Sequence, residues 1–379
     1  MKNKLKKCVI CFLLISIGVL IGSLSSKKET ALEEEIFVKK DVNTLSMMLE
    51  TETGSGNYEL TTRSEWPTEG YVFNSELSKC ENGGELSWDD ENKRILMSGN
   101  VSDKCYVYFD KAFTLSDYVK SQYTGTQGEN SIYYHNDTLT NGAGDNSYRY
   151  AGASSAVNNY ICLGSLESIC PDANLFRIIG VFGDQVKVIR AKSIGIMAWN
   201  NNGSNTWSSA SLNTYLKETY LPSLGTLADK IATTTWKVGG NVWDNIGLQT
   251  AKVAYENEVG SNSLALTFVA KIGLIYVSDY MYAVPKDKWI LVGTSYSKVV
   301  SVNWIYLYDD SPGWFITPNT FNTYYAYSVY SNYGYSDNGN IMGGSSSDAS
   351  FVHPAFYLLS SVTYKSGTGS SASDPIRIN

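Results

Sequence analysis

One run of residues, 303–340, constrains the fold more than any other. It holds two tryptophans and eight tyrosines, interleaved with Asn, Ser, Asp and Gly. The tyrosines fall on both parities of the run, whereas a half-buried strand alternates apolar and polar side chains. We therefore expect some of these rings to face water. Rigid rings among small polar side chains are typical of a binding surface, and the alternative is an edge strand with loops in a β-rich core, where Tyr is common.

If the run forms a recognition surface, its rings would stack on a ligand and its amides and carboxylate would supply hydrogen bonds. The stacking candidates are Trp304, Tyr306, Tyr308, Trp314, Tyr324, Tyr325, Tyr327, Tyr330, Tyr333 and Tyr335. The hydrogen-bonding candidates are Asn319, Asn322, Asn332, Asp337 and Asn338. The sequence predicts an extracellular glycan or protein as the ligand and leaves its identity open.

Length and charge limit the classes of protein to consider. With 379 residues the chain is too long for one ordinary domain. Its net charge is −7, and no basic stripe follows the N-terminus, so we expect no nucleic-acid partner. An aromatic content of 13% beside a charged content of 18% is typical of secreted β-rich proteins and argues against wholesale disorder.

The N-terminus has the pattern of an export signal. A lysine-rich head at 2–7 precedes an apolar run at 8–24, which is a charged region followed by a hydrophobic segment. The length of the run lies between that of a signal peptide and that of a membrane span. We predict a signal peptide or membrane anchor over 1–28, with membrane contact through 8–24 and all later residues outside the cell. Whether the segment is cleaved stays open.

Four cysteines follow the apolar run, namely Cys80, Cys105, Cys162 and Cys170. An even number of cysteines outside the membrane indicates disulfides. Pairing neighbours predicts a Cys80–Cys105 bridge and a Cys162–Cys170 bridge. A four-cysteine zinc site is the alternative, but the exported part has no C-x-x-C spacing.

Composition divides the exported part into four segments. Residues 29–56 are dense in charge and predict a stalk, with a helical turn around 45–49. Residues 57–112 hold short alternating runs separated by turn residues, which predicts a small all-β module linked by a disulfide. Residues 113–160 are rich in turn residues and predict a connector. Residues 161–379 predict a second, larger domain.

The second domain begins with the clearest hairpin signal of the chain. Two apolar runs, 175–182 and 185–190, flank a Gly-Asp turn. Helical spacing follows at 210–221, and a last apolar strand is expected at 352–362. Strands, then helices, then strands predict an α+β fold.

Three motifs give this domain a family resemblance. Residues 211–217 read SLNTYLK, 314–318 read WFITP and 352–355 read VHPA. In order and spacing they resemble the S-x-L-R-x-W-L-N, W-L-R-S-P and V-R-P-A motifs of an uncharacterised bacterial surface-domain family, which is distantly similar to the sulfatase-modifying domains. The arginines of the last two motifs are replaced here by Ile316 and His353, so a charge-dependent role of those positions does not carry over.

The resemblance covers 174–362 and implies a C-type-lectin-like fold. In that fold the opening and closing strands lie close together, and the long late loops share one ligand-binding face. Residues 80–110 look like a module that accompanies such domains in exported proteins of gut Gram-positive bacteria. The implied function follows from fold analogy alone.

Catalytic and metal-binding signatures are sparse. The chain lacks H-E-x-x-H and G-x-S-x-G. Of its two histidines, His135 is expected to be exposed and His353 to be structural. The neighbours Asp309 and Asp310 could act as acid and base or bind a cation, but adjacent acidic residues in a loop more often serve in turns. We expect no catalysis, no cofactor and no resident metal, and calcium dependence stays open.

These observations together predict an extracellular ligand-binding surface protein, an adhesin or lectin-like molecule that uses a Tyr/Trp/Asn-rich face. The alternative is a structural cell-envelope protein whose aromatic face packs on a neighbouring subunit or wall polymer. Large exposed aromatic patches suit either role.

Overall fold

The computed structural model describes residues 45–67, 70–99, 103–240, 246–261, 263, 266–306, 313–330 and 336–379. The chain divides into two compact units, Met1–Ala112 (unit 1) and Phe113–Asn379 (unit 2). The predicted export segment, 1–28, lies outside the described residues. Within the described ranges, no helix combines the length and hydrophobicity of a membrane span.

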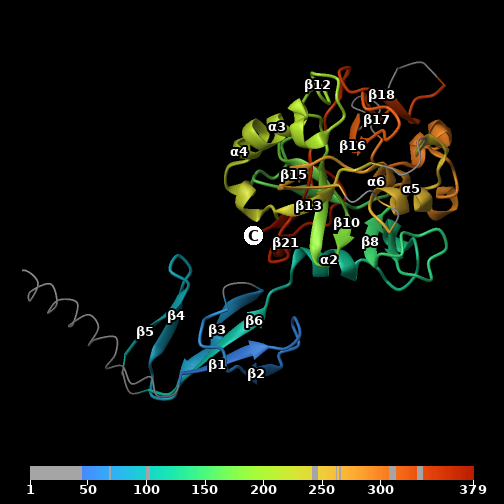
Figure 1. Ribbon diagram of the computed structural model, residues 1–379. Coiled ribbons are helices and arrows are strands. Elements are labelled where there is room, and N and C mark those ends of the chain that lie inside the picture. Colours follow the sequence, from blue (N-terminus) through green and yellow to red (C-terminus); the bar gives the residue numbers. More distant parts are fainter. Residues whose placement is uncertain are drawn as a thin grey trace, which may run out of the picture. The chain divides into compact units, whose positions relative to one another are not determined.

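The described part of unit 1 is an all-β module. Its strands are β1 (Leu45–Glu50), β2 (Tyr58–Leu60), β3 (Tyr71–Cys80), β4 (Glu85–Asp89), β5 (Arg94–Ser98) and β6 (Cys105–Lys111). Four of them form a sheet in the order β2-β1-β6-β3, and β4 pairs with β5 in a separate hairpin (Figure 1). This agrees with the prediction of short strands over 57–112.

The helical turn expected around 45–49 is wrong, because these residues form β1 and pair in parallel with β6. Leu45, Met47 and Leu49 recur at every second position, and all three pack in the core of unit 1 with Val107 and Phe109. A spacing of two places them on one face of a strand. The segment predicted as a stalk therefore supplies a strand of unit 1.

The predicted Cys80–Cys105 disulfide is confirmed. Cys80 is the last residue of β3 and lies opposite Cys105, the first residue of β6. The bridge thus closes the end of the sheet beside a small aromatic core. A bridge of this kind stabilises a small module by roughly 2–4 kcal/mol.

Unit 2 is built on a nine-stranded sheet, which confirms a mixed α+β fold rich in strands. Its strands are β7 (Ile132–His135), β8 (Ser147–Tyr150), β9 (Tyr160–Cys162), β10 (Leu175–Phe182), β11 (Gln185–Arg190), β15 (Ile272–Gly273), β20 (Ala355–Tyr357), β21 (Tyr364–Ser366) and β22 (Ile376–Ile378). The main order is β15-β20-β11-β10-β9-β22-β21, and β8 joins β7 to β10. The Cys162–Cys170 disulfide, also as predicted, lies at the end of β9.

The segment 113–160, predicted as a connector, is part of unit 2. It supplies β7, β8 and the first residue of β9 to the nine-stranded sheet. Gly180 on β10 lies opposite Arg149 on β8, and a Cβ at Gly180 would come within 2.1 Å of the Tyr148 carbonyl oxygen. The missing side chain therefore lets β8 approach β10, an effect that composition does not reveal.

The predicted hairpin is present as β10 and β11. The closing strand is shorter than the predicted 352–362, because only β20 pairs with β11. Beyond β20, Val352 forms an isolated bridge with Gly313, and Leu358 forms one with Ile231. The opening hairpin and the closing strand are neighbours, but β20 contacts β11 rather than β10.

Short helices cover the sheet. The α-helices are α2 (Leu115–Ser121), α3 (Ser211–Tyr215), α4 (Leu221–Ser223), α5 (Ala251–Glu258) and α6 (Val277–Tyr282). The 3₁₀ turns are η1 (Glu129–Ser131), η2 (Trp207–Ser209), η4 (Gly225–Lys230), η5 (Ile246–Leu248), η6 (Lys286–Lys288), η7 (Gly293–Lys298) and η8 (Val300–Val302), and η3 (Leu216–Tyr220) is a π-helix. The helix predicted over 210–221 is thus α3, η3 and the start of α4. In unit 2, α3 and α4 lie on one side and α5 and α6 on the other (Figure 1).

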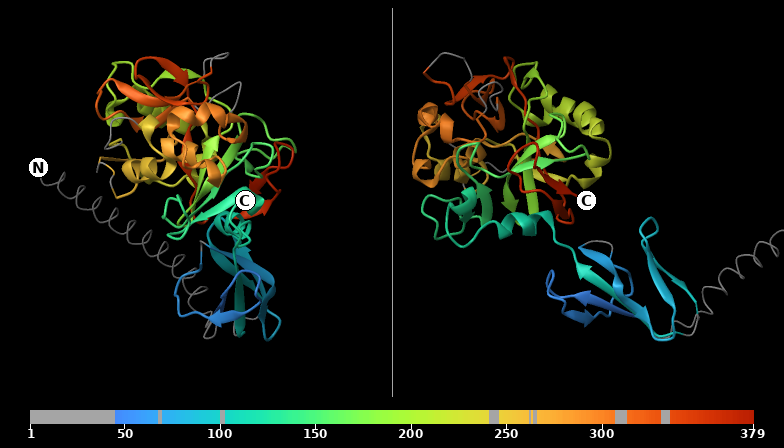
Figure 2. Two further views of the ribbon diagram at one scale, coloured as in Figure 1. Left: turned by 90° about the vertical axis from the view of Figure 1, so that its right-hand side faces the viewer. Right: turned by 180° about the vertical axis from the view of Figure 1, so that it is seen from behind.

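Small sheets complete unit 2. Their strands are β12 (Ile196–Ala198), β13 (Thr234–Lys237), β14 (Thr267–Ala270), β16 (Trp314–Pro318), β17 (Tyr325–Val329), β18 (Ile341–Ser345) and β19 (Ala349–Phe351). The sheet β16-β17-β18 and the pair β12-β19 lie at one end of unit 2, and α2 and β21 lie at the other (Figures 1 and 2). The described part of the tyrosine-rich run therefore includes the β16-β17 hairpin.

Candidate functional site

Four of the predicted ligand-stacking rings are buried, so their assignment to a ligand-contacting surface is wrong. Trp304, Tyr306, Trp314 and Tyr327 are each 6% exposed or less. The Trp304 indole donates to the carbonyl oxygen of Tyr150 at 2.8 Å. The Trp314 indole donates to that of Met197 at 2.9 Å, and the Tyr327 hydroxyl accepts from Asn319 Nδ2 at 3.3 Å. These polar atoms have partners inside unit 2, which allows the rings to enter its core.

The remaining candidates divide between the two ends of β17. Asn319, Asn322, Tyr324 and Tyr325 lie at its start. Tyr330, Asp337 and Asn338 belong to the connection from β17 to β18, where Tyr330 N–H donates to the Asn340 carbonyl oxygen at 2.8 Å. The candidates that lie outside the described residues are Tyr308, Asn332, Tyr333 and Tyr335.

The exposed rings gather in residues 319–325, which we call the aromatic loop and which comprise the connection from β16 to β17 and the first residue of β17. Phe321 is 74% exposed, Tyr324 is 62% exposed and Tyr325 is 40% exposed. Phe321 is absent from the sequence-based candidates, which included only tyrosines and tryptophans among the rings. Phe321 stands between Asn319-Thr320 and Asn322-Thr323. These polar residues favour turns and so indicate an exposed loop position for the ring between them.

The aromatic loop is held by its own amides. Asn319 Oδ1 accepts from the N–H groups of Phe321 and Asn322, both at 2.9 Å. Asn322 Oδ1 accepts from Tyr324 N–H at 2.9 Å. Asn319 N–H donates to the Tyr325 carbonyl oxygen at 2.9 Å and closes the loop. The two asparagines were predicted to bind ligand, but their side-chain oxygens instead form Asx-type turns that fix the backbone.

A distant asparagine holds the loop from below. Asn205 precedes α3, and its Nδ2 lies 2.6, 3.0 and 2.7 Å from the carbonyl oxygens of Asn319, Asn322 and Tyr325, which share its two hydrogens. Its backbone N–H donates to the Thr323 carbonyl oxygen at 2.7 Å. Asn205 is only 9% exposed, so these bonds are shielded from water. Sequence patterns could not reveal this residue, because its nearest loop partner is 114 positions away.

Glycines border the exposed rings. A Cβ at Gly203 would lie 3.8 Å from Tyr324 Cδ1, and a Cβ at Gly343 would lie 3.8 Å from Tyr325 Cδ2. Ser346 N–H donates to the Tyr324 carbonyl oxygen at 2.7 Å, which ties the loop to the strand beyond Gly343. The aromatic loop thus presents three rings on a backbone fixed before any ligand arrives, which lowers the entropy cost of binding.

Behind the loop, a buried carboxyl supports β16. Glu258, at the end of α5, accepts from Val277 N–H at 3.0 Å and from Ser278 N–H at 2.8 Å, and the Thr317 hydroxyl donates to it. Thr317 is two residues before the aromatic loop. Burial raises the pKa of Glu258 to about 7, although its hydrogen bonds with Thr317 and Ser278 act in the opposite direction.

Buried charges fill the core beside Glu258. Lys187 Nζ lies 2.5 Å from Asp279 Oδ2, and Arg149 Nη2 lies 2.6 Å from Asp145 Oδ2. Burial lowers the pKa of Lys187, and Asp279 partly offsets that shift. His135, expected to be exposed, is also buried, and its Nδ1 accepts from Ala143 N–H at 3.0 Å.

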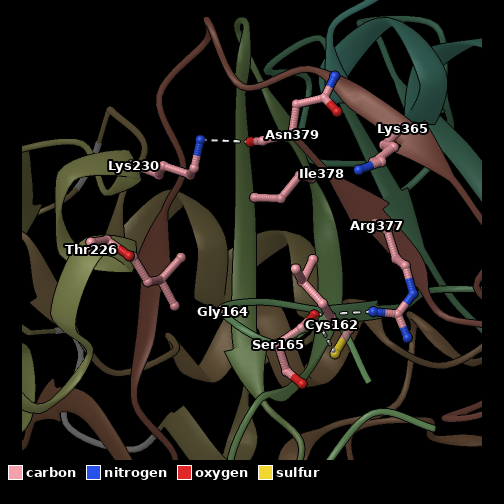
Figure 3. Close-up of a pocket in the computed structure, with 11 residues that line it drawn as sticks. Cys162, Gly164, Ser165, Thr226, Lys230, Lys365, Arg377, Ile378 and Asn379 are labelled. Carbon is pink, nitrogen blue, oxygen red and sulfur yellow. Dashed lines mark hydrogen bonds between the residues drawn. The ribbon is translucent and has the colours of Figure 1, made fainter. Parts of the chain in front are cut away.

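A pocket of about 400 Å³ lies at the opposite end of unit 2 from the aromatic loop, next to the Cys162–Cys170 disulfide (Figure 3). Lys230, Lys365 and Arg377 line it, without an acidic side chain among the described residues. Lys230 Nζ donates to the Asn379 main-chain oxygen at 2.6 Å, and Arg377 Nη1 donates to the Ser165 carbonyl oxygen at 3.0 Å. Two of the three cations thus hold the surrounding backbone together.

Metal binding has little support in the described residues. Cys80, Asp103 and Cys105 form a group with metal-ligand spacing. Both thiols are joined in a disulfide, so they cannot act as thiolate ligands. Asp103 accepts from the N–H groups of Asn82 and Gly84 instead. The acidic pair Asp309-Asp310 lies outside the described residues.

A scan of protein-family models and searches among curated proteins and solved structures returned no match to this chain. The arrangement of strands and helices establishes the mixed α+β fold. The more specific lectin-like fold stays a prediction from the three motifs.

Proposed function

We propose that this chain is an extracellular ligand-binding surface protein and that the aromatic loop is its contact surface. The observation that carries the proposal is the exposure of Phe321, Tyr324 and Tyr325 on one short, hydrogen-bonded loop. Fully burying one such ring would contribute roughly 1.5–3 kcal/mol to folding. Three neighbouring rings stay exposed and do not contribute this free energy to folding. An exposed aromatic patch of this kind indicates a binding site for a partner that covers the rings.

The chemistry of the loop favours a glycan or a protein as the ligand. Flat rings stack on the apolar faces of sugars and on peptide side chains, and they order few rotatable bonds when they do so. The ligand would meet rings at the surface and hydrogen-bonding groups at the rim. Tyr330 and Asn338 are half-buried and Asp337 is exposed. These three residues would extend the binding surface only for a ligand long enough to reach past β17.

An extracellular setting is supported by the two disulfides, which persist in oxidising compartments. The lysine-rich head and apolar run at 2–24, which have the pattern of an export signal, also support this location. For unit 2 we propose a C-type-lectin-like fold, on the strength of the order of its three motifs. We propose no catalysis for the aromatic loop, since its exposed side chains are phenyl and phenol rings.

The test is a glycan and surface-protein array probed with residues 45–379, which include every described residue of both units. The loop variant replaces Phe321, Tyr324 and Tyr325 with Ser, and the matched control is Leu166→Ser. Leu166 is 91% exposed and lines the pocket at the other end of unit 2. Binding that disappears in the loop variant and survives in the control supports the proposal.

Two results would count against it. Equal binding by the wild type and the loop variant would place the contact surface elsewhere. A protein that gives no array signal and self-associates through the same rings would favour the alternative, a structural envelope protein whose aromatic face packs on a neighbouring subunit. Sedimentation of the wild type and the loop variant distinguishes that case.

A further inference from the structure

The core of unit 2 holds one lysine and one aspartate in direct contact and away from water. Lys187 lies on β11 and Asp279 on α6, 92 positions apart. Their Nζ and Oδ2 atoms are 2.5 Å apart, and the two side chains are 1% and 2% exposed. A buried ion pair carries a desolvation cost that its attraction often fails to repay.

Aromatic rings enclose the amine. The Lys187 Nζ lies 4.6 Å from the centroid of the Tyr276 ring, 5.4 Å from that of Tyr357, 5.5 Å from that of Trp236 and 5.7 Å from that of Phe182. Burial lowers the pKa of Lys187 and so favours its neutral, nucleophilic form. The rings also limit access of water to the two side chains, and water would hydrolyse any bond formed between the amine and the carboxyl group.

We propose that Lys187 and Asp279 condense to an intramolecular isopeptide bond that joins β11 to α6. The reaction converts an ammonium and a carboxylate into an amide and one molecule of water. One proton passes from Nζ to Oδ2, and the neutral amine then attacks Cγ. A second proton follows from nitrogen to Oδ2, the Cγ–Oδ2 bond breaks, and water leaves. Oδ1 becomes the amide carbonyl, and no oxidant or other reactant is required.

Arg149 is placed to stabilise the intermediate. Its Nη1 lies 3.6 Å from Asp279 Oδ1, the oxygen on which negative charge grows during the attack. Among the described residues, this buried Nη1 has no hydrogen-bond partner, so its donors are available to that oxygen. A preformed cation at the developing charge is a strong source of rate enhancement in a dry site.

The charge balance also favours condensation. Arg149 keeps its partner Asp145, whose Oδ2 lies 2.6 Å from Nη2. The reaction therefore removes one buried positive charge and one buried negative charge and leaves the other pair intact. Two desolvated ions are replaced by one neutral amide, which relieves the desolvation cost.

Mass spectrometry of the folded full chain tests the proposal. After reduction of the disulfides and proteolysis, we expect a branched peptide that contains Lys187 and Asp279 and weighs one water less than the sum of its two parts. Fragmentation should locate the link at these two side chains. Peptide masses are independent of whether the N-terminal segment has been removed.

The chain provides an internal control. Lys120 Nζ lies 2.8 Å from Asp184 Oδ1, but these side chains are 30% and 77% exposed. This pair has the same functional groups without the dry setting, so its peptides should stay separate. A link at both pairs would point to an artefact of sample handling.

Two variants separate the chemistry from folding. Asp279→Asn should give a branched peptide of the same mass as the wild type, because ammonia leaves in place of water. Asp279→Ala should give two separate peptides. Recovery of unmodified Lys187 and Asp279 peptides from folded wild-type protein overturns the proposal, and that result does not depend on whether any variant folds.

Discussion

The aromatic loop and the core around Lys187 place their side chains in opposite ways. In the loop, amide groups lie beneath and hold exposed rings at the surface. In the core, rings lie outside and enclose charged groups. Each arrangement is unfavourable alone, since one leaves apolar area in water and the other removes ions from it. In the loop, polar groups support the exposed rings, whereas in the core aromatic rings enclose the charged groups.

The largest expected effect comes from breaking the core pair. Asp279→Ala removes the carboxyl group that Lys187 contacts, so the variant can form neither the buried ion pair nor the proposed amide bond. We expect a loss of about 3–5 kcal/mol in the free energy of unfolding, measured by urea denaturation. The control, Asp184→Ala, breaks an exposed pair and should cost at most about 1 kcal/mol. Equal losses in the two variants would mean that burial of the Lys187 pair has no energetic consequence.

The next effect is a pH dependence from Glu258, which supports β16. Its folded-state pKa of about 7 lies above its ordinary value of 4.5. The folded state therefore binds the Glu258 proton more tightly than the unfolded state does. The resulting contribution of Glu258 to the free energy of unfolding is complete below pH 4.5, the ordinary pKa. That contribution is lost as pH rises through about 7 and amounts to about 3 kcal/mol.

Unfolding free energies measured between pH 4.5 and pH 8 should show this decline. In Glu258→Gln the decline should disappear, while the exposed Glu218→Gln variant should keep it. A decline that persists unchanged in Glu258→Gln would assign the pH dependence to another group.

A smaller effect is expected from Asn205, the residue that holds the aromatic loop from below. Asn205→Ala leaves three carbonyl oxygens without their shared donor, and we expect a cost of about 1–3 kcal/mol. Amide hydrogen exchange should accelerate in the aromatic loop, and ligand affinity should fall although Asn205 would not contact the ligand. Asn201→Ala, an exposed neighbour, is the control, and unchanged exchange in Asn205→Ala would show that the loop is held by its own turns alone.

The smallest effect on stability should come from the rings themselves. Replacing Phe321, Tyr324 and Tyr325 with Ser changes exposed side chains, so each should alter the unfolding free energy by no more than about 0.5 kcal/mol. Thermal unfolding of this variant beside the wild type checks the expectation. A large destabilisation would mean that the rings serve folding rather than recognition.

Local patterns predicted much of the fold. The Cys80–Cys105 and Cys162–Cys170 pairs follow from nearness in sequence, and the β10-β11 hairpin follows from two apolar runs around a turn. The role of 113–160 in the nine-stranded sheet was missed, because it depends on contact between β8 and Gly180. The helical turn expected at 45–49 is wrong because Leu45, Met47 and Leu49 alternate as in a strand and pack in the core of unit 1.

The candidate site was predicted in part. Tyr324 and Tyr325 are exposed as expected, whereas Trp304 and Trp314 are buried. Periodicity does not say whether a distant carbonyl will accept from an indole, as those of Tyr150 and Met197 do here. The fixed geometry of the loop depends on Asn205, a contact across the fold that one sequence alone cannot supply.

The most direct test of the recognition surface is the dissociation constant of an array-selected ligand, measured by calorimetry for the wild type and for the triple Ser variant of the aromatic loop. We predict a weakening of at least about a hundredfold, as expected when several aromatic contacts near the centre of an interface are lost. Leu166→Ser should bind as the wild type does. Equal affinity of the wild type and the triple variant, with both proteins folded, would contradict the account.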